Sequence, residues 1–153
     1  GQWIYAISWR GVFLRSREWR GPFEAQHEPG PAMRLFDDGS DIELRHPTLW
    51  RQGDVLHLFF SCTGDCPERV YHSQCAVHDD WDCWEFSQPQ IILSPELTWE
   101  GADLSLTTSV MGAANSRLCE LRDPGILVED GRAYLFYSGA GERAIGIAQL
   151  DGL

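Results

Sequence analysis

The stretch Leu121–Glu142, LRDPGILVEDGRAYLFYSGAGE, predicts two short strands joined by a tight turn. Ile126–Val128 is an apolar run with β-branched residues, and Tyr134–Tyr137 is an aromatic run of the kind enriched in strands. Asp130-Gly131 between them is a hairpin turn signal, because glycine adopts positive φ without steric cost. We therefore expect a β-hairpin here.

The same pattern occurs earlier in the chain, in Leu44–Asp65, LRHPTLWRQGDVLHLFFSCTGD. The two stretches align without a gap at an offset of 77 residues. Identical residues in the earlier copy are Leu44, Arg45, Pro47, Leu58, Phe59, Ser61 and Gly64. An internal repeat indicates a fold built from copies of one unit.

Composition indicates a packed globular domain. The chain has 153 residues, of which 43% are hydrophobic and 12% aromatic, enough for one domain with a core. Seven tryptophans fit either sugar stacking or the filling of β-sheet cores. The formal charge of −11, with arginine as the only cationic side chain besides histidine, argues against nucleic acid or an anionic membrane as partners.

Five cysteines are present without paired Cys-x-x-Cys units, which argues against a structural zinc site. We expect reduced thiols in a cytoplasmic protein, with a Cys62–Cys66 bridge as the alternative. The sequence has no apolar run of transmembrane length and no visible secretory leader.

Turn residues divide the chain into short strands, and no segment predicts a helix. We expect a partial unit over residues 1–40, a full unit over 41–94, an irregular excursion over 95–119 and an incomplete last unit over 120–153. Gly21–Gly39 is expected to be mostly loop. Besides the two repeated hairpins, the expected strands are Trp3–Ser8, Val12–Ser16, Arg69–Cys75, Trp81–Phe86 and Ala144–Leu150.

The predicted fold is all-β, with four-stranded antiparallel sheets arranged as blades of a propeller, about half of a five-bladed ring. Such an arc leaves open strand edges and exposed apolar faces. We therefore expect either a fragment of a larger propeller or a homodimer that completes the ring.

The resemblance to a known family lies in the repeated segments. The chain resembles five-bladed propeller glycosidases, nearest to glycoside hydrolase family 43 and more distantly to families 32 and 68. The closing blade of these enzymes is resembled by Leu121–Pro124, Gly131–Glu142 and Ala144–Ala148. The preceding blade is resembled by Leu44–Pro47 with Leu58–Ser61, and the outer strands of the blade before it by Gly11–Phe23. The resemblance implies a central funnel lined by two or three carboxylates and a carbohydrate substrate, with glycosidic bond hydrolysis as the ancestral chemistry. The family's N-terminal blades, which carry its aspartate base, have no counterpart in this sequence. A non-catalytic carbohydrate-binding or structural half-propeller is therefore the alternative.

Asp123 is the leading catalytic candidate. It matches the aspartate of the family's Arg-Asp-Pro motif, which the resemblance implies binds sugar hydroxyls and stabilises positive charge at the anomeric carbon. The alternative is a structural aspartate in the turn before Pro124. His46 occupies the matching place in the other copy, as a sugar-binding or a structural residue.

Arg45 and Arg122 occupy equivalent places as substrate-binding candidates, or as residues that tie neighbouring strands together. Glu100 is the second catalytic candidate, because the family's general acid often lies in a Glu-Gly pair. Trp99 beside it could raise its pKa or stack on a sugar ring, and a solvated loop carboxylate is the alternative. No cofactor is expected. The alternative, which the resemblance implies for some family members, is a calcium ion bound in the funnel.

Overall fold

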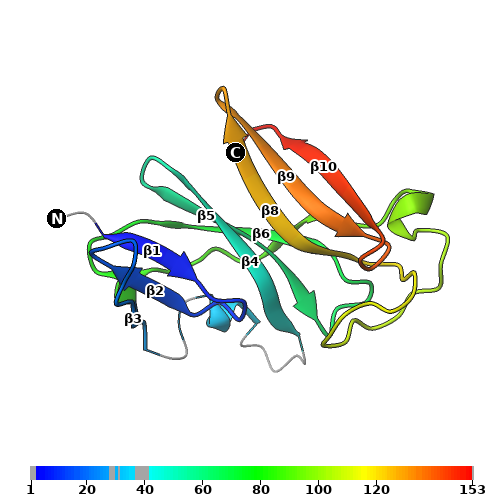
Figure 1. Ribbon diagram of the computed structural model, residues 1–153, viewed down its shortest axis with the longest axis horizontal. Helices are drawn as coiled ribbons and strands as arrows, with labels where there is room; N and C mark the ends of the chain where they lie inside the picture. The colour runs from blue at the N-terminus through cyan, green and yellow to red at the C-terminus, as the bar shows by residue number, and fades with distance from the viewer. Residues whose placement is uncertain (1–2, 28–29, 31, 37–41, 153) are drawn as a thin grey trace.

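The computed structural model describes residues 3–27, 30, 32–36 and 42–152, and within them ten strands form three antiparallel sheets (Figure 1). Sheet A consists of β1 (Ile4–Ile7), β2 (Phe13–Ser16) and β3 (Glu24–Ala25). Sheet B has the order β4 (Glu43–Gln52), β5 (Val55–Thr63), β6 (Val70–Ala76) and β7 (Gln90–Leu93). Sheet C has the order β8 (Leu121–Glu129), β9 (Arg132–Gly139) and β10 (Ala144–Leu150). The expected all-β class is confirmed.

The helical content of the described residues is limited to three 3-10 turns. These are η1 (Met33–Phe36), η2 (Trp81–Cys83) and η3 (Thr98–Glu100). No described helix has the length and apolarity that crossing a membrane requires.

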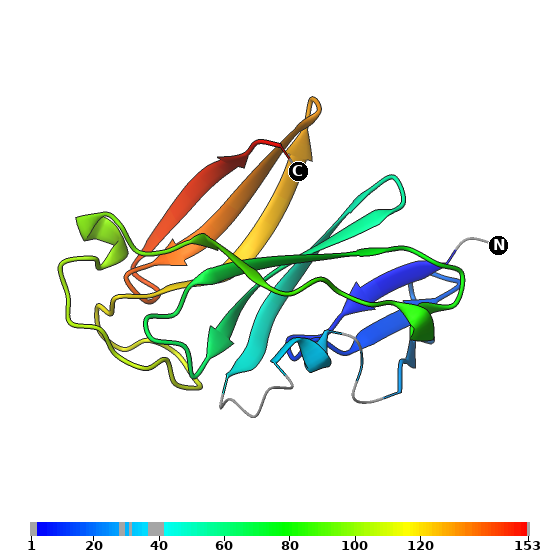
Figure 2. The ribbon, with the colours of Figure 1, turned by 180° about the vertical axis from the view of Figure 1, so that it is seen from behind.

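The sheets lie in chain order, with sheet B between the other two (Figures 1 and 2). We call the face of each sheet that points along the direction from A to C its forward face, and the opposite face its back face. One core cluster joins Phe13 on the forward face of sheet A to Leu58 and Phe60 on the back face of sheet B. A second joins Phe59 on the forward face of sheet B to Leu135 on the back face of sheet C. Alternation along β5 therefore sends successive side chains into two different cores.

The repeated segments fold alike. The β4–β5 hairpin pairs Arg45 with Ser61 and then shifts register before Thr48, and the β8–β9 hairpin pairs Arg122 with Ser138 and shifts before Gly125. The residue after each arginine has a left-handed backbone, with φ of 46° at His46 and 53° at Asp123. β4 and β8 are the edge strands of their sheets and lie side by side.

The predicted strand at Trp81–Phe86 is wrong. The segment begins with η2, which the Asp80 side chain caps by accepting a hydrogen bond from the Asp82 N–H at 3.1 Å. Its tryptophans fill the core between sheets A and B, where Trp84 packs edge-on against Phe13 at 5.3 Å between ring centroids. The fourth strand of sheet B is β7, which is the apolar run that follows Pro89. An aromatic-rich run suits a strand or a buried turn equally well, so sequence pattern did not separate the two.

Other sequence expectations can be compared with the described residues. The strand predicted at Ala144–Leu150 is confirmed as β10, and the Asp130-Gly131 turn joins β8 to β9. Gly21–Gly39, expected to be loop, also contributes β3 and η1. Residues 28, 29, 31 and 37–39 of that loop, and residues 1, 2, 40, 41 and 153 of the predicted units, lie outside the described part.

All five cysteines are free thiols, so the alternative of a Cys62–Cys66 bridge is not realised. Cys62 is buried in the core between sheets A and B, whereas Cys66 is exposed. Burial is the largest cause that raises the pKa of the Cys62 thiol, and the nearby acids Asp65 and Glu68 raise it further.

Candidate functional site

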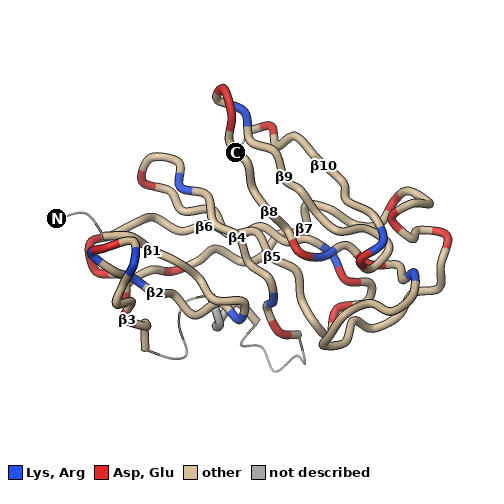
Figure 3. The backbone as a smooth tube through the Cα atoms, viewed as in Figure 1, with Lys and Arg blue, Asp and Glu red and all other residues tan. Residues whose placement is uncertain are grey.

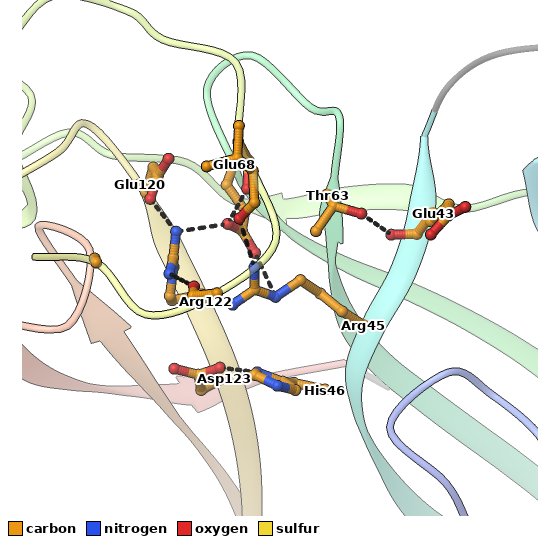
Figure 4. A network of polar contacts seen from close by, with 12 residues as sticks. Glu43, Arg45, His46, Thr63, Glu68, Glu120, Arg122 and Asp123 are labelled. Carbon is orange, nitrogen blue, oxygen red and sulfur yellow. Dashed lines mark hydrogen bonds and ion pairs between the residues drawn. The ribbon is translucent and has the colours of Figure 1, made fainter.

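His46 and Asp123 form a pair at the junction of sheets B and C (Figure 4). The Nδ1 atom of His46 and the Oδ1 atom of Asp123 are hydrogen-bond partners. Their side chains are 42% and 32% exposed, so both remain accessible to a solute. The structure thus brings together the two residues that the repeat alignment places at matching positions.

A β-bulge with a left-handed residue points the His46 and Asp123 side chains outward. Each follows a buried arginine directly in the chain, and each lies within the bulge of its edge strand. The left-handed backbone breaks the strand's regular alternation there, and bulges of this kind re-aim side chains. Aspartate is one of the few non-glycine residues that tolerate this conformation.

Trp9 extends the exposed pair onto sheet A. The Trp9 carbonyl accepts a hydrogen bond from the His46 backbone N–H at 3.0 Å, and the two rings lie 6.5 Å apart between centroids. The Trp9 side chain is exposed, with the Arg10 guanidinium 4.7 Å from the centroid of its ring. Trp9, His46 and Asp123 therefore come from three successive sheets and form one surface, here called the junction surface.

Beneath the junction surface lies a buried ion cluster. Glu68 is completely buried and bridges the two repeated arginines, with Oε1 3.5 Å from Arg45 Nε and Oε2 3.1 Å from Arg122 Nη2. Figure 4 shows Glu68 between the arginines of β4 and β8. Because one carboxylate faces a guanidinium from each sheet, it ties sheet B to sheet C.

Further partners surround the arginines. Arg122 is also paired with Glu120, and with Glu142 at 3.1 Å. The carbonyl of Val110 accepts a hydrogen bond from Arg45, and that of Gly112 one from Arg122, each at 3.3 Å. Burial alone would lower the pKa of Arg122, but the carboxylates of Glu68, Glu120 and Glu142 outweigh it, so its pKa lies above the ordinary value.

These contacts bear on the sequence hypotheses for Arg45 and Arg122. Both guanidiniums are enclosed by carboxylates and carbonyls, which matches the alternative in which they tie neighbouring strands together. Their proposed substrate contact stays a prediction.

Glu100 and Trp99 lie at another part of sheet C. Glu100 is buried, with Oε1 accepting from the Tyr137 hydroxyl at 2.7 Å and Oε2 accepting from the backbone N–H groups of Glu96 and Leu97 at 2.9 Å. The Trp99 ring rests on β9 and β10, so close to Gly146 that an added Cβ there would lie 2.7 Å from it. Burial, and then the hydrogen bond that the Tyr137 hydroxyl donates to Glu100, raise the pKa of Tyr137.

The structure therefore does not join Glu100 and Trp99 to the junction surface. They contact β9 and β10, whereas Asp123 lies on β8 beside β4. Both oxygens of the Glu100 carboxylate are engaged in holding its own loop and Tyr137. Its role as general acid stays a prediction, and these contacts are those of a structural carboxylate.

Two residues of this region were missed by sequence reasoning. Glu68 lies between two strands and outside the aligned repeat, and the only signal for it was the need of two equivalent arginines for a carboxylate. Trp9 lies in the β1–β2 turn, where a tryptophan has no turn-forming role and so marks an exposed aromatic. Within the described residues, no group of three or more His, Cys, Asp or Glu side chains could hold a metal ion.

Comparison with known proteins adds one relative and no family. No family model matches the chain. The chain is 38% identical over 114 residues to a protein of Acanthamoeba polyphaga mimivirus that bears the name "Uncharacterized protein R118". The matched region is 74% of this chain and 32% of the viral protein, so the chain spans about a third of that relative's length.

Proposed function

We propose that the three sheets are successive blades of a propeller of the glycosidase type, and that the junction surface binds carbohydrate. The observation that carries the proposal is the exposed His46–Asp123 pair, held at equivalent bulges of two adjacent edge strands. Such strands would be the innermost of each blade, where ligands of these folds bind. A second copy of the chain that completes the ring is part of the proposal.

The chemistry of the junction surface suits a neutral sugar. The Asp123 carboxylate and the His46 Nε2 atom offer acceptors for sugar hydroxyls, and the exposed face of Trp9 offers a platform for a pyranose ring. A lone Asp123 would also favour positive charge at an anomeric carbon, which is the ancestral role that the family resemblance implies.

Binding is favoured over turnover by the state of the neighbouring acids. Hydrolysis requires two carboxyl groups about 5–10 Å apart on either side of the scissile bond. Glu68 and Glu120 are buried in ion pairs with arginine, and Glu100 is engaged at β9. We therefore propose a carbohydrate-binding protein of glycosidase ancestry.

The proposed setting is the cytoplasm, without nucleic acid or membrane partners. Free thiols at all five cysteines are typical of a reducing compartment. The formal charge of −11 disfavours polyanionic partners.

The proposal is tested by glycan-array screening followed by calorimetry on the best ligand. We expect Asp123→Asn to lower the affinity at least about tenfold, because a hydrogen bond to a charged acceptor is lost. Asp54→Asn makes the same chemical change in the fully exposed β4–β5 turn and should leave the affinity unchanged. Absence of glycan binding, or equal affinity of Asp123→Asn, would contradict the proposal. Aryl-glycoside hydrolysis that Asp123→Asn abolishes would replace binding with catalysis.

A further inference from the structure

A cavity of about 310 Å³ lies between sheets A and B, near the turn that joins β4 to β5. Trp3 and Tyr5 line it on the side of sheet A, and residues of β4 and β5 line it on the side of sheet B. Both walls belong to neighbouring sheets that pack on one another, so the cavity is not part of an outer face of the stack. Among the described residues, those that line it include none of the junction surface.

Strand register explains the lining on the side of sheet B. Leu49 pairs with Leu58, which lies on the back face of that sheet, and Arg51 pairs with Leu56. Because side chains alternate along a strand, Leu49, Arg51 and Leu56 all lie on this back face and are directed at sheet A. Among the described lining residues, Arg51 is the one with a charge, in surroundings that are otherwise apolar or aromatic.

Three aromatic rings meet at the cavity. Tyr5 and Trp84 lie 5.1 Å apart between ring centroids in a tilted arrangement, and Trp84 is buried. The third ring, that of Trp3, has the Arg15 guanidinium 4.5 Å from its centroid, and the same guanidinium lies 4.0 Å from the centroid of Trp81. Rings held in this way offer faces and edges on which another aromatic ring can stack.

The size and lining of the cavity restrict the ligand. Pockets for small molecules have volumes of about 300 to 1,000 Å³, so this cavity suits a molecule of one or two fused rings. A neutral sugar is disfavoured, because the apolar lining would leave most of its hydroxyls without hydrogen-bond partners.

The charge at Arg51 adds a second requirement. Its Nε–H donates to the Gly53 carbonyl at 2.9 Å, which holds the side chain in place and leaves the Nη groups for an anion. The nearest carboxylate is that of Asp54, with Oδ1 3.8 Å from Nη2, and the Asp54 side chain is 96% exposed. Because such an exposed pair contributes little, a carboxylate of the ligand can take the place of Asp54 at the guanidinium. Figure 3 shows basic and acidic residues at the β4–β5 turn and beside β1 and β2.

We propose that this cavity binds a small planar aromatic carboxylate, with its ring among Trp3, Tyr5 and Trp84 and its carboxylate on Arg51. The ligand lies between two sheets and contacts both. The site shares no residue with the junction surface, so it is independent of the carbohydrate proposed there.

Calorimetry on the full chain with 2-naphthoate, and with its neutral analogue 2-naphthamide, tests the proposal. We expect saturable binding of one 2-naphthoate per chain with a dissociation constant of about 1 mM or lower, and affinity for 2-naphthamide at least about tenfold weaker. Arg51→Gln should abolish this preference, because the charged donor is lost. Arg132→Gln makes the same change at the exposed start of β9 and should keep it.

Filling the cavity tests its location. Val77 lines the cavity, and Val77→Phe should weaken both ligands at least about tenfold, because the added ring occupies their place. Val128→Phe makes the same change at an exposed position of β8 and should leave both affinities unchanged. Thermal melts show whether each variant is folded, and the Arg51→Gln comparison decides the proposal even where Val77→Phe does not fold.

Four results would overturn the proposal. These are no saturable binding of 2-naphthoate, equal affinity of the wild-type chain for 2-naphthamide, an unchanged preference in Arg51→Gln, and full affinity in a folded Val77→Phe chain. None of them bears on glycan binding at the junction surface.

Discussion

Consecutive residues at the junction of sheets B and C differ sharply in environment. Arg45 and Arg122 are 2% exposed and are held by Glu68, whereas the next residues, His46 and Asp123, open to solvent. A left-handed residue in each bulge produces this split. The comparison indicates that one layer holds the sheets together and the other is free for a ligand, so the two should respond differently to substitution.

The largest effect is expected from breaking the buried layer. Glu68→Gln leaves two buried guanidiniums without the carboxylate between them, and we expect a loss of about 3–5 kcal/mol in unfolding free energy. Urea denaturation at pH 7 measures it. Glu85→Gln makes the same change at an exposed site and serves as the control. Equal stability of Glu68→Gln and wild type would show that the cluster does not fasten the sheets.

A second buried pair sharpens the contrast with the exposed His46. His57 Nδ1 and His72 Nε2 lie 2.9 Å apart, and both residues are buried. Burial, and then the charge of His57, lower the pKa of His72 to about 4, and burial lowers the pKa of His57. The unfolded chain therefore binds more protons below pH 6.5, so the stabilisation is complete above that pH and is lost as the pH falls toward 4.

We expect this loss to be about 3 kcal/mol, measured as the unfolding free energy at pH 7 and at pH 4. His72→Phe should flatten the dependence, because an uncharged ring can still stack on Phe59. His78→Gln removes an exposed histidine as the control. A His72→Phe variant with the full pH dependence would assign the loss to other groups.

The next prediction concerns the packing of the Trp99 and Tyr137 rings against Gly146. An added Cβ at Gly146 would lie 2.3 Å from the Tyr137 ring and 2.7 Å from the Trp99 ring, so Gly146→Ala should cost about 2 kcal/mol through overpacking. Gly125→Ala meets only the Cβ of Phe136, at 4.0 Å, and is the control in the same sheet. Thermal melts that coincide for both variants would contradict this packing.

The smallest effect on stability is expected in the exposed layer. Asp123→Asn removes one charge from a pair that is about a third exposed, and such pairs contribute less than about 1 kcal/mol. Asparagine also tolerates the left-handed backbone. Urea denaturation should therefore barely distinguish this variant from wild type, while its glycan affinity falls. A loss comparable to that of Glu68→Gln would make Asp123 part of the structural layer.

Sequence analysis correctly predicted the local structure of the two repeated segments. Alignment of Leu44–Asp65 with Leu121–Glu142 anticipated two like hairpins and the matching places of His46 and Asp123, because the hairpin turns and bulges are local properties. Sequence analysis did not identify Glu68, because the two arginines that it pairs with, Arg45 and Arg122, are distant from it in the chain. The strand predicted around Trp81 and Trp84 was wrong, because these side chains are buried in the core between sheets A and B and do not belong to a paired strand.

The most direct test of the junction surface is a ¹H–¹⁵N NMR titration of the wild-type chain with an oligosaccharide selected on the array. We predict saturable shifts at the His46 and Asp123 amides and at the Trp9 indole N–H, with the Trp99 indole unmoved. Shifts centred on Trp99, or none at the junction of sheets B and C, would contradict the account.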